Sequence, residues 1–475
     1  MRTELKSYRA EARDKAIAVM EDSGGFLLIN EQRTGKTQIA LAVAERFAKE
    51  APHLLIVCPK GAIGVWEKAL ADEGLYPKPK LFRYFQEVTI TNYEQLRARH
   101  MEWYKWADKR KGKLLIIADE VHRIKDRGSG QSRTLRTLRR RARYRIGLTG
   151  TPIEKGLEDS WALFDFINPD IFGPFDNELA PDKKTIIKLG FEGRYLIRGG
   201  FKNKQVVGYR NKKDYKEKLH ANSYRITLHE AKVLDGKIPP IMHYRKSYLQ
   251  LSSKTRRIYE DLKEELVAVV NKKTVKVKNV LACCTKLQQI TGGFLRETWI
   301  EEREVKRGRK TVFKQVKCHE DHQVGMEKIE QLHQELRSIR AGTKFLVICR
   351  HIWEIETLAS WLKKHGYDMT IVRGGSPYSG KIEGDGILVQ IASAVAVDMS
   401  EADTIFFYST DYSSIKFEQA RFRILSYSKG KTAKYVFLLA KDTVDELIYE
   451  AISNKKRFVD LVIDKYRHQK GATSG

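Results

Sequence analysis

Two stretches of the chain share one hydrophobic pattern, in which short continuous apolar runs alternate with segments whose apolar residues recur at helical spacing. Apolar strands separated by helices predict a parallel sheet that helices cover on both faces. In the first third the runs are GFLLIN (25–30), LLIVCP (54–59), KLLIIADE (113–120) and YRIGLTGTP (144–152). In the last third they are KFLVICR (344–350), DMTIVRG (368–374), GILVQIA (386–392), TIFFYS (404–409) and YVFLLA (435–440), with a helix from about Asp442. The pattern predicts an α/β protein with two doubly wound parallel-sheet lobes.

The pattern changes between these stretches. SSKTRRIYEDLKEELVAVV and NVLACCTKLQQI have helical periodicity, whereas EEREVKRGRKTVFKQV predicts a hairpin that turns near Gly308. The chain has 475 residues, more than one core of roughly 250–300 residues can organise. We therefore expect three domains: an N-terminal lobe over 1–175, a helical insert with a basic hairpin over 176–325, and a C-terminal lobe over 326–475.

The charge balance favours a polyanionic partner. Lys and Arg total 88 against 60 Asp and Glu, a formal net charge of +28, which suits the release of counterions from nucleic acid. Four basic residues crowd the end of the predicted hairpin, and we call them the basic tip: Lys306, Arg307, Arg309 and Lys310. They are candidates for nucleic-acid contact, although a charged run of this kind is also typical of a plain solvated face.

Tryptophans such as Trp66 lie in apolar helical patterns and are expected in the core rather than against bases.

The same composition argues against membranes and secretion. No apolar run has the 18–20 residues that a membrane helix needs, and the N-terminus lacks an apolar signal core. Five cysteines without paired spacing suit a reducing compartment. We expect a cytoplasmic protein with no membrane partner, and the short basic KRGRK run leaves a nuclear location open.

Thr34, Gly35, Lys36 and Thr37 follow the first apolar strand and open a helical segment. This is the context in which backbone N–H groups and a helix N-terminus bind phosphates. Lys36 is expected to meet the β- and γ-phosphates of a nucleotide, and Thr37 to ligate Mg²⁺. The first glycine of the strict phosphate-loop pattern is replaced by Asn30, so a second motif is needed to support the prediction.

Asp119 and Glu120 supply that second motif, because they end the strand KLLIIA, where open α/β sheets bind ligands. Asp119 is expected to hold Mg²⁺, and Glu120 to orient or deprotonate the attacking water. The alternative is an ordinary helix start, where acidic residues are also favoured. A third strand ends in LTGTP, whose Thr149 and Thr151 hydroxyls can sense a γ-phosphate.

GKT, DEVHRIKD, LTGTPIEKGLEDSWALFDFINPDIFG and the late QARFR together resemble superfamily-two helicases, specifically the Swi/Snf-like DNA-dependent ATPases. TNYEQL (91–96), KLQQITGGFL (286–295) and KFLVICRHIWEIETLASWL (344–362) fall where that family has its other core motifs, so the resemblance covers nearly the whole chain. It implies two RecA-like lobes with ATP and Mg²⁺ between them, and translocation on double-stranded or branched DNA in replication, recombination or repair. The length implies a compact, motor-only member of the kind found in bacteria and their phages.

The resemblance also implies roles for single residues. His122, Thr149 and Thr151 match coupling positions, and Gln419 matches the start of the motif in the second lobe that faces ATP. Arg423 matches an arginine finger, which neutralises charge on the transferred phosphoryl group. Arg9, after Tyr8, stands where the family has a glutamine that reads adenine.

Two departures keep other functions open. Ser426 stands where the family has a second arginine finger, although Lys429 lies close enough in sequence to supply a cation. Arg9 in place of glutamine suggests relaxed base selectivity. One alternative is therefore a DNA-binding protein whose degenerate ATPase acts as a nucleotide switch. Another is a strand-separating or RNA-directed helicase of the same superfamily.

Overall fold

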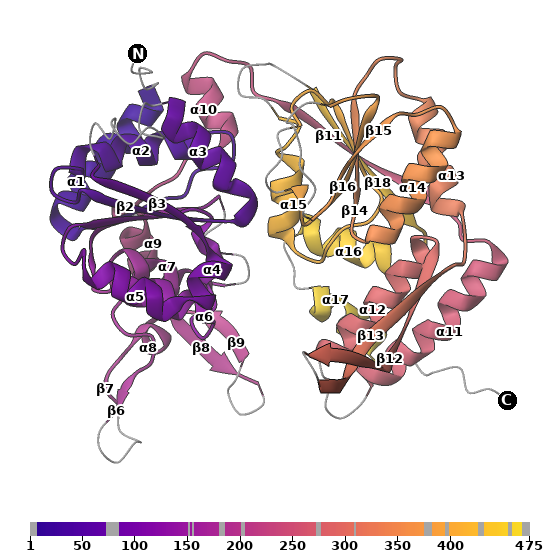
Figure 1. The fold of residues 1–475 in the computed structure, drawn as a ribbon, viewed down its shortest axis with the longest axis horizontal. Coiled ribbons are helices and arrows are strands. Elements are labelled where there is room, and N and C mark those ends of the chain that lie inside the picture. Colours follow the sequence, from indigo (N-terminus) through magenta and orange to yellow (C-terminus); the bar gives the residue numbers. More distant parts are fainter. Residues whose placement is uncertain are drawn as a thin grey trace. The chain divides into compact units, whose positions relative to one another are not determined.

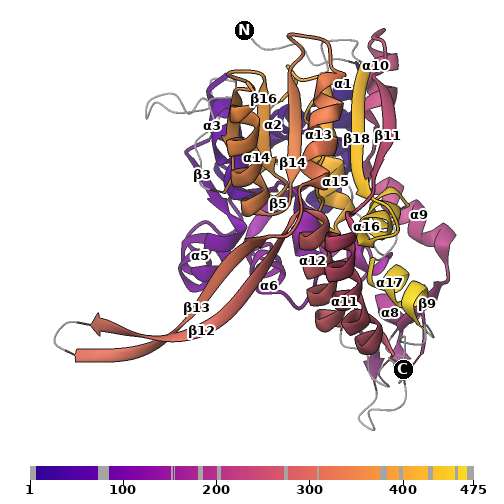
Figure 2. The ribbon, with the colours of Figure 1, turned by 90° about the vertical axis from the view of Figure 1, so that its right-hand side faces the viewer.

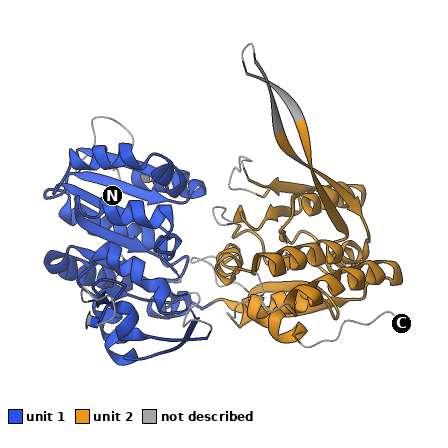
Figure 3. Cartoon of the chain, turned by 90° about the horizontal axis from the view of Figure 1, so that it is seen from below, with its two compact units in different colours: residues 1–239, 427–430 blue, residues 240–426, 431–475 orange. Residues whose placement is uncertain are grey.

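The computed structural model describes residues 7–72, 85–150, 153, 156–179, 186–200, 205–271, 277–307, 310–374, 382–394, 399–425, 432–454 and 458–467. The chain forms two compact units (Figure 3): unit 1 comprises residues 1–239 and 427–430, and unit 2 comprises residues 240–426 and 431–475. Each unit contains its own six-stranded sheet. The segment 176–325 is divided between the units, because its first part completes the sheet of unit 1 and its later part belongs to unit 2.

The sheet of unit 1 is entirely parallel, in the order β10-β1-β5-β4-β2-β3. Its strands are β1 (Gly25–Leu28), β2 (His53–Cys58), β3 (Glu87–Asn92), β4 (Leu114–Ala118), β5 (Ala142–Leu148) and β10 (Ser223–Tyr224). The four apolar runs of the first third form β1, β2, β4 and β5, so the predicted parallel sheet is confirmed. The pattern did not reveal β3 and β10, since β3 is only partly buried at an edge and β10 is two residues long.

Helices cover both faces of this sheet (Figure 1). Leu114 and Ile116 of β4 belong to the core on one face, whereas Leu115 and Ile117 belong to the core on the other. This alternation is the two-residue period of a strand buried on both sides. The first face is covered by α4 (Tyr93–Ala98), α5 (His100–Asp108), α6 (Gly130–Leu138) and α7 (Glu158–Ile167). The second is covered by α1 (Ser7–Ser23), α2 (Lys36–Phe47) and α3 (Ile63–Asp72).

Smaller elements complete unit 1. Two 3-10 turns, η1 (Lys60–Ala62) and η2 (Val121–Ile124), follow β2 and β4. Two short antiparallel pairs are β6 (Glu178–Leu179) with β7 (Ile186–Lys188) and β8 (Leu196–Gly199) with β9 (Gln205–Tyr209). The remaining helices are α8 (Phe191–Tyr195), α9 (Lys212–Ala221) and α10 (Leu228–Leu234).

The sheet of unit 2 is also parallel, in the order β11-β18-β17-β14-β16-β15. Its strands are β11 (Ile241–Leu249), β14 (Phe345–Cys349), β15 (Met369–Val372), β16 (Gly386–Gln390), β17 (Thr404–Phe407) and β18 (Thr432–Ala440). Its helices are α11 (Ser253–Val270), α12 (Val277–Thr291), α13 (Glu327–Arg337), α14 (Ile352–Lys364), α15 (Ser414–Arg421), α16 (Val444–Ser453) and α17 (Phe458–Tyr466). The five predicted strands of the last third are confirmed.

No helix among the described residues is long and apolar enough to cross a bilayer.

The predicted hairpin is a two-stranded ribbon of β12 (Phe294–Arg307) and β13 (Lys310–Gln323). The strands pair without interruption from Phe294 opposite Gln323 to Arg307 opposite Lys310. Figure 2 shows the ribbon extending away from the helices and sheet of its unit. At about 3.4 Å per residue, fourteen residues reach roughly 47 Å, so the basic tip lies far from the base of the ribbon.

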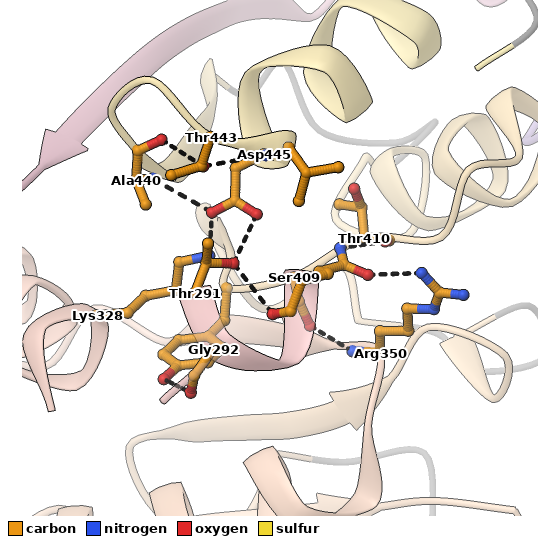
Figure 4. A network of polar contacts seen from close by, with 12 residues as sticks. Thr291, Gly292, Lys328, Arg350, Ser409, Thr410, Ala440, Thr443 and Asp445 are labelled. Carbon is orange, nitrogen blue, oxygen red and sulfur yellow. Dashed lines mark hydrogen bonds and ion pairs between the residues drawn. The ribbon is translucent and has the colours of Figure 1, made fainter. Parts of the chain in front are cut away.

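A buried polar network joins the helices of unit 2 beneath its sheet (Figure 4). Lys328 Nζ donates to Asp445 Oδ2 at 2.6 Å, and Thr291 Oγ1 donates to Asp445 Oδ1 at 2.9 Å. The Lys328 side chain is only 1 % exposed and that of Asp445 only 4 %. A buried charge is tolerated when it is paired and hydrogen-bonded. The ion pair joins α13 to α16, and the Thr291 bond joins α12 to both.

Candidate nucleotide site

Three neighbouring strands of unit 1 end at the predicted phosphate and metal residues. β1, β5 and β4 are adjacent and parallel, so their carboxyl ends lie at one edge of the sheet. The predicted phosphate loop, residues 30–37, follows β1, while Thr149 follows β5 and Asp119 follows β4. Ligands of open α/β sheets bind at this edge, and the fold therefore brings the separate sequence motifs of unit 1 together.

The phosphate loop is shaped by Gly35. This residue is the N-cap of α2 and has a left-handed backbone with φ 83°, a conformation that glycine adopts without steric cost. A Cβ atom here would also approach Arg9 Nε to 2.7 Å. Thr34 is fully buried, and its hydroxyl donates to the carbonyl of Glu31 at 2.7 Å. Thr34 and Gly35 thus hold the loop closed around the start of α2.

Lys36 and Thr37 are the first two residues of α2. The first N–H groups of a helix have no partner within it and, with the helix dipole, attract anions. Lys36 Nζ donates to the carbonyls of Asn30 at 2.8 Å and Glu31 at 3.1 Å. An ammonium group on a flexible stem can leave these neutral acceptors for the stronger attraction of a phosphate.

The Asp119 carboxylate is held on both oxygens. Oδ1 accepts from the backbone N–H of Glu120 at 2.9 Å, and Oδ2 accepts from Trp66 Nε1, also at 2.9 Å. Burial, together with the charge of Glu120, raises the pKa of Asp119 to about 6, against the opposing effects of the Trp66 bond and the Lys36 charge. Two adjacent carboxylates on a buried edge make a strongly negative site, which a divalent cation would relieve.

His122 connects the acidic pair to the end of β5. Its Nδ1 atom lies 3.2 Å from Glu120 Oε2 and 3.1 Å from Thr149 Oγ1. Both His122 and Thr149 are buried. The backbone N–H of Thr149 donates to the carbonyl of Leu28, the last residue of β1, over 3.0 Å. A change in the position of Glu120 would therefore be transmitted through His122 and Thr149 to the ends of β5 and β1. Thr151 lies outside the described residues.

The start of α1 reaches the phosphate loop, where the resemblance placed base recognition. Tyr8 Oη donates to the carbonyl of Thr34 at 2.9 Å. Arg9 Nη1 donates to Gln38 Oε1 at 2.6 Å, and Arg9 Nε donates to Tyr8 Oη at 3.0 Å. Both residues are brought to the loop, but their contact with a base stays a prediction.

Gln419 and Arg423 belong to unit 2. Gln419 lies on α15 and is largely buried, and Arg423 follows the end of that helix, where its carbonyl accepts from the backbone N–H of Met399 at 3.2 Å. Their contact with ATP stays a prediction. Ser426 and Lys429 lie outside the described residues, as does Arg309 of the basic tip, while the other three tip residues are at the ends of β12 and β13.

Sequence patterns did not reveal two neighbours of Asp119. Trp66 is a buried core residue, as predicted, but its indole also bonds the Asp119 carboxylate. Tyr93 Oη donates to the Asp119 carbonyl at 2.7 Å. Neither residue lies in the phosphate loop or the acidic motif, and only the packing of α3 and α4 on the sheet brings them here. Among the described residues, no group of three or more His, Cys, Asp or Glu side chains is arranged to hold a metal ion.

Two units, each built on a parallel six-stranded sheet, place the chain in the class of two-lobed α/β proteins, whose sheets bind ligands at the carboxyl ends of their strands. Residues 75–292 match the model of the SNF2-related domain. The resemblance of the chain to the Swi/Snf-like proteins is therefore confirmed.

Curated relatives match nearly the whole chain. A SWI/SNF-related matrix-associated actin-dependent regulator of chromatin subfamily A member 1 from Mus musculus is 21 % identical over 98 % of this chain and 44 % of its own length. A chromodomain-helicase-DNA-binding protein 1-like from the same species is 24 % identical over 98 % of this chain and 51 % of its own length. The chain thus spans about half the length of these relatives.

One solved structure that matches is the Sulfolobus solfataricus SWI2/SNF2 ATPase core in complex with dsDNA. It is 17 % identical, covers 98 % of this chain and 94 % of its own, and aligns with a TM-score of 0.41.

Proposed function

We propose that this chain is a DNA-dependent ATPase, a motor that couples ATP hydrolysis to movement on double-stranded or branched DNA. One observation carries the proposal: the edge of the unit 1 sheet holds Lys36, Asp119 and Glu120 together, and His122 links Glu120 to Thr149. Residues of the kinds that can bind phosphate, ligate a metal ion and orient water thus lie close together, and the His122 contacts would link them to the end of β5.

The residues at this edge fit ATP with Mg²⁺. The N–H groups at the start of α2 and the Lys36 ammonium would bind the phosphates. The oxygens of Thr37 and Asp119 would hold Mg²⁺, which favours oxygen ligands and neutralises charge on the phosphates. Glu120 would orient the attacking water and accept its proton, with His122 fixing the Glu120 carboxylate.

Unit 2 is proposed to complete the reaction. An arginine that meets the transferred phosphoryl group stabilises the transition state electrostatically, and Arg423 matches that role. Gln419 would face the nucleotide from α15. Tyr8 and Arg9 would lie beside the nucleotide in unit 1, because both already contact the phosphate loop or its helix.

DNA is the proposed partner on two grounds. The net charge of +28 favours a polyanion, and the ribbon of β12 and β13 carries the basic tip away from the rest of unit 2. The matched relatives are named as chromatin regulators and as a helicase DNA-binding protein. We extend the proposal to DNA replication, recombination or repair, where branched DNA arises.

The decisive test is steady-state ATP hydrolysis with no nucleic acid, duplex DNA, single-stranded DNA, branched DNA and RNA. Duplex or branched DNA should stimulate hydrolysis, and Lys36→Ala or Glu120→Gln should abolish it while circular dichroism stays unchanged. Arg13→Ala is a suitable control, because its only described ion pair is with exposed Asp14. Equal rates of hydrolysis with and without each nucleic acid would refute the motor, and stimulation by RNA alone would favour an RNA-directed helicase.

A further inference from the structure

Trp66 combines a core position with an unusual bond. It lies on α3 and is 1 % exposed, within the core cluster on the face of the sheet that α1 and α2 also cover. Although its ring is packed among apolar side chains, its indole N–H donates to the charged Asp119 carboxylate, at 2.9 Å from Oδ2. Buried indole N–H groups need a partner, but a backbone carbonyl would satisfy that need equally well, as the Gly173 carbonyl does for Trp161 at 3.0 Å.

The bond fixes one carboxylate without using up its capacity. An ionised carboxylate has about four lone-pair sites on its two oxygens, and Trp66 and the Glu120 backbone occupy one on each oxygen. Tyr93 meanwhile holds the Asp119 backbone through its carbonyl. The carboxylate is therefore held in one orientation while lone pairs on both oxygens remain for a cation.

The indole is well suited chemically to this task. It only donates, so it cannot become a competing metal ligand, and it is neutral, so it leaves the negative charge of the carboxylate in place. A lysine or arginine would give a stronger bond but would repel the cation. Partners that orient a ligating carboxylate in this way are typically worth 10- to 100-fold in metal affinity.

We propose that Trp66 is a positioning residue for the metal site, which holds the Asp119 carboxylate in the orientation that binds Mg²⁺ with the nucleotide. The inference rests on the proposed function, because it assigns Asp119 to the metal. It extends the site to α3, a helix that carries none of the predicted site residues.

The test measures metal binding directly, by electron paramagnetic resonance of Mn²⁺ titrated into the full chain with ADP. Trp66→Phe keeps an aromatic ring in the core and removes the donor, so we expect about 10-fold weaker Mn²⁺ binding. Trp161→Phe is the matched control, since it also removes a buried indole donor in unit 1, but one that bonds a backbone carbonyl. ADP binding in the presence of a chelator should be alike in both variants.

A second variant separates the bond from the packing. Benzothienylalanine at position 66 keeps the fused ring and its packing and replaces the N–H by sulfur, so it should weaken Mn²⁺ binding as Trp66→Phe does. Mn²⁺ affinity equal to that of Trp161→Phe in both variants would overturn the role of Trp66 while leaving the proposed function intact. Failure of the unaltered protein to bind Mn²⁺ with ADP would overturn both.

Discussion

Glu354 is a fully buried carboxyl group whose titration should control the stability of unit 2. It lies in the first turn of α14 and is 1 % exposed. Its Oε2 atom accepts from the backbone N–H groups of Arg350 at 3.1 Å and His351 at 3.0 Å, and from Ser409 Oγ. Oε1 has no partner among the described residues. Burial raises the pKa of Glu354 from 4.5 to about 7, although these bonds and the charge of Lys328 oppose the rise.

The direction and size of the pH effect follow from this difference. Between pH 4.5 and about 7 the folded protein keeps a proton that the unfolded protein has lost, so stability falls as pH rises and levels off above 7. One unit of pKa difference corresponds to about 1.4 kcal/mol, so the free energy of unfolding should lose about 3 kcal/mol across this range through Glu354. Glu354→Gln cannot ionise and should lose that dependence.

Urea unfolding followed by circular dichroism, from about pH 3 to pH 8, would test this reasoning. The glutamine amide leaves an NH₂ group where Oε1 stands, at a cost of about 1–3 kcal/mol that does not depend on pH. The quantity to compare is therefore how the free energy of unfolding changes with pH. Between about pH 4.5 and pH 8 that free energy should fall by about 3 kcal/mol less in Glu354→Gln than in the unaltered protein.

Glu335→Gln provides a control of opposite sign in the same unit. Burial alone would raise the pKa of Glu335, but hydrogen bonds from Arg245 and Ser247 outweigh it and lower the pKa. Glu335 therefore contributes stability above its unfolded pKa that is lost as pH falls, and its removal should flatten the acid side of the profile. Identical slopes for Glu354→Gln and the unaltered protein would show that Glu354 ionises normally, and would refute the argument from burial.

Two further predictions concern the proposed motor. Replacing the four residues of the basic tip by alanine should weaken duplex DNA binding and reduce the slope of log K against log salt by up to about 0.9 per lost phosphate contact. Fluorescence anisotropy at several salt concentrations measures this, and an unchanged slope would assign the tip to a solvated face. Arg423→Ala should lower DNA-stimulated ATP turnover by about 10³-fold or more while nucleotide binding survives. Full turnover in that variant would show that another residue supplies the arginine finger.

Much of the fold follows from the sequence alone. Continuous apolar runs identify nine of the twelve strands in the two sheets, because most of these strands are buried on both faces, where polar residues are disfavoured. Gly35, Lys36, Asp119 and Thr149 could be found because each directly follows such a run or opens the next helix. Strand ends of a parallel sheet meet at one edge whatever the intervening sequence, so the site of unit 1 was predictable as a set.

Other features depend on tertiary packing. The edge strands β10 and β11 come from the middle segment, and only pairing with β1 and β18 gives each a place in a sheet. The bond from Trp66 to Asp119 could not be foreseen either, because an indole in an apolar helix looks the same in sequence whether its N–H meets a carbonyl or a carboxylate. A short apolar pattern specifies that a side chain is buried, whereas its polar partner is set by contacts between residues far apart in the chain. Sequence therefore determined the strands and the residues at their ends, and the three-dimensional packing decided which neighbours orient those residues.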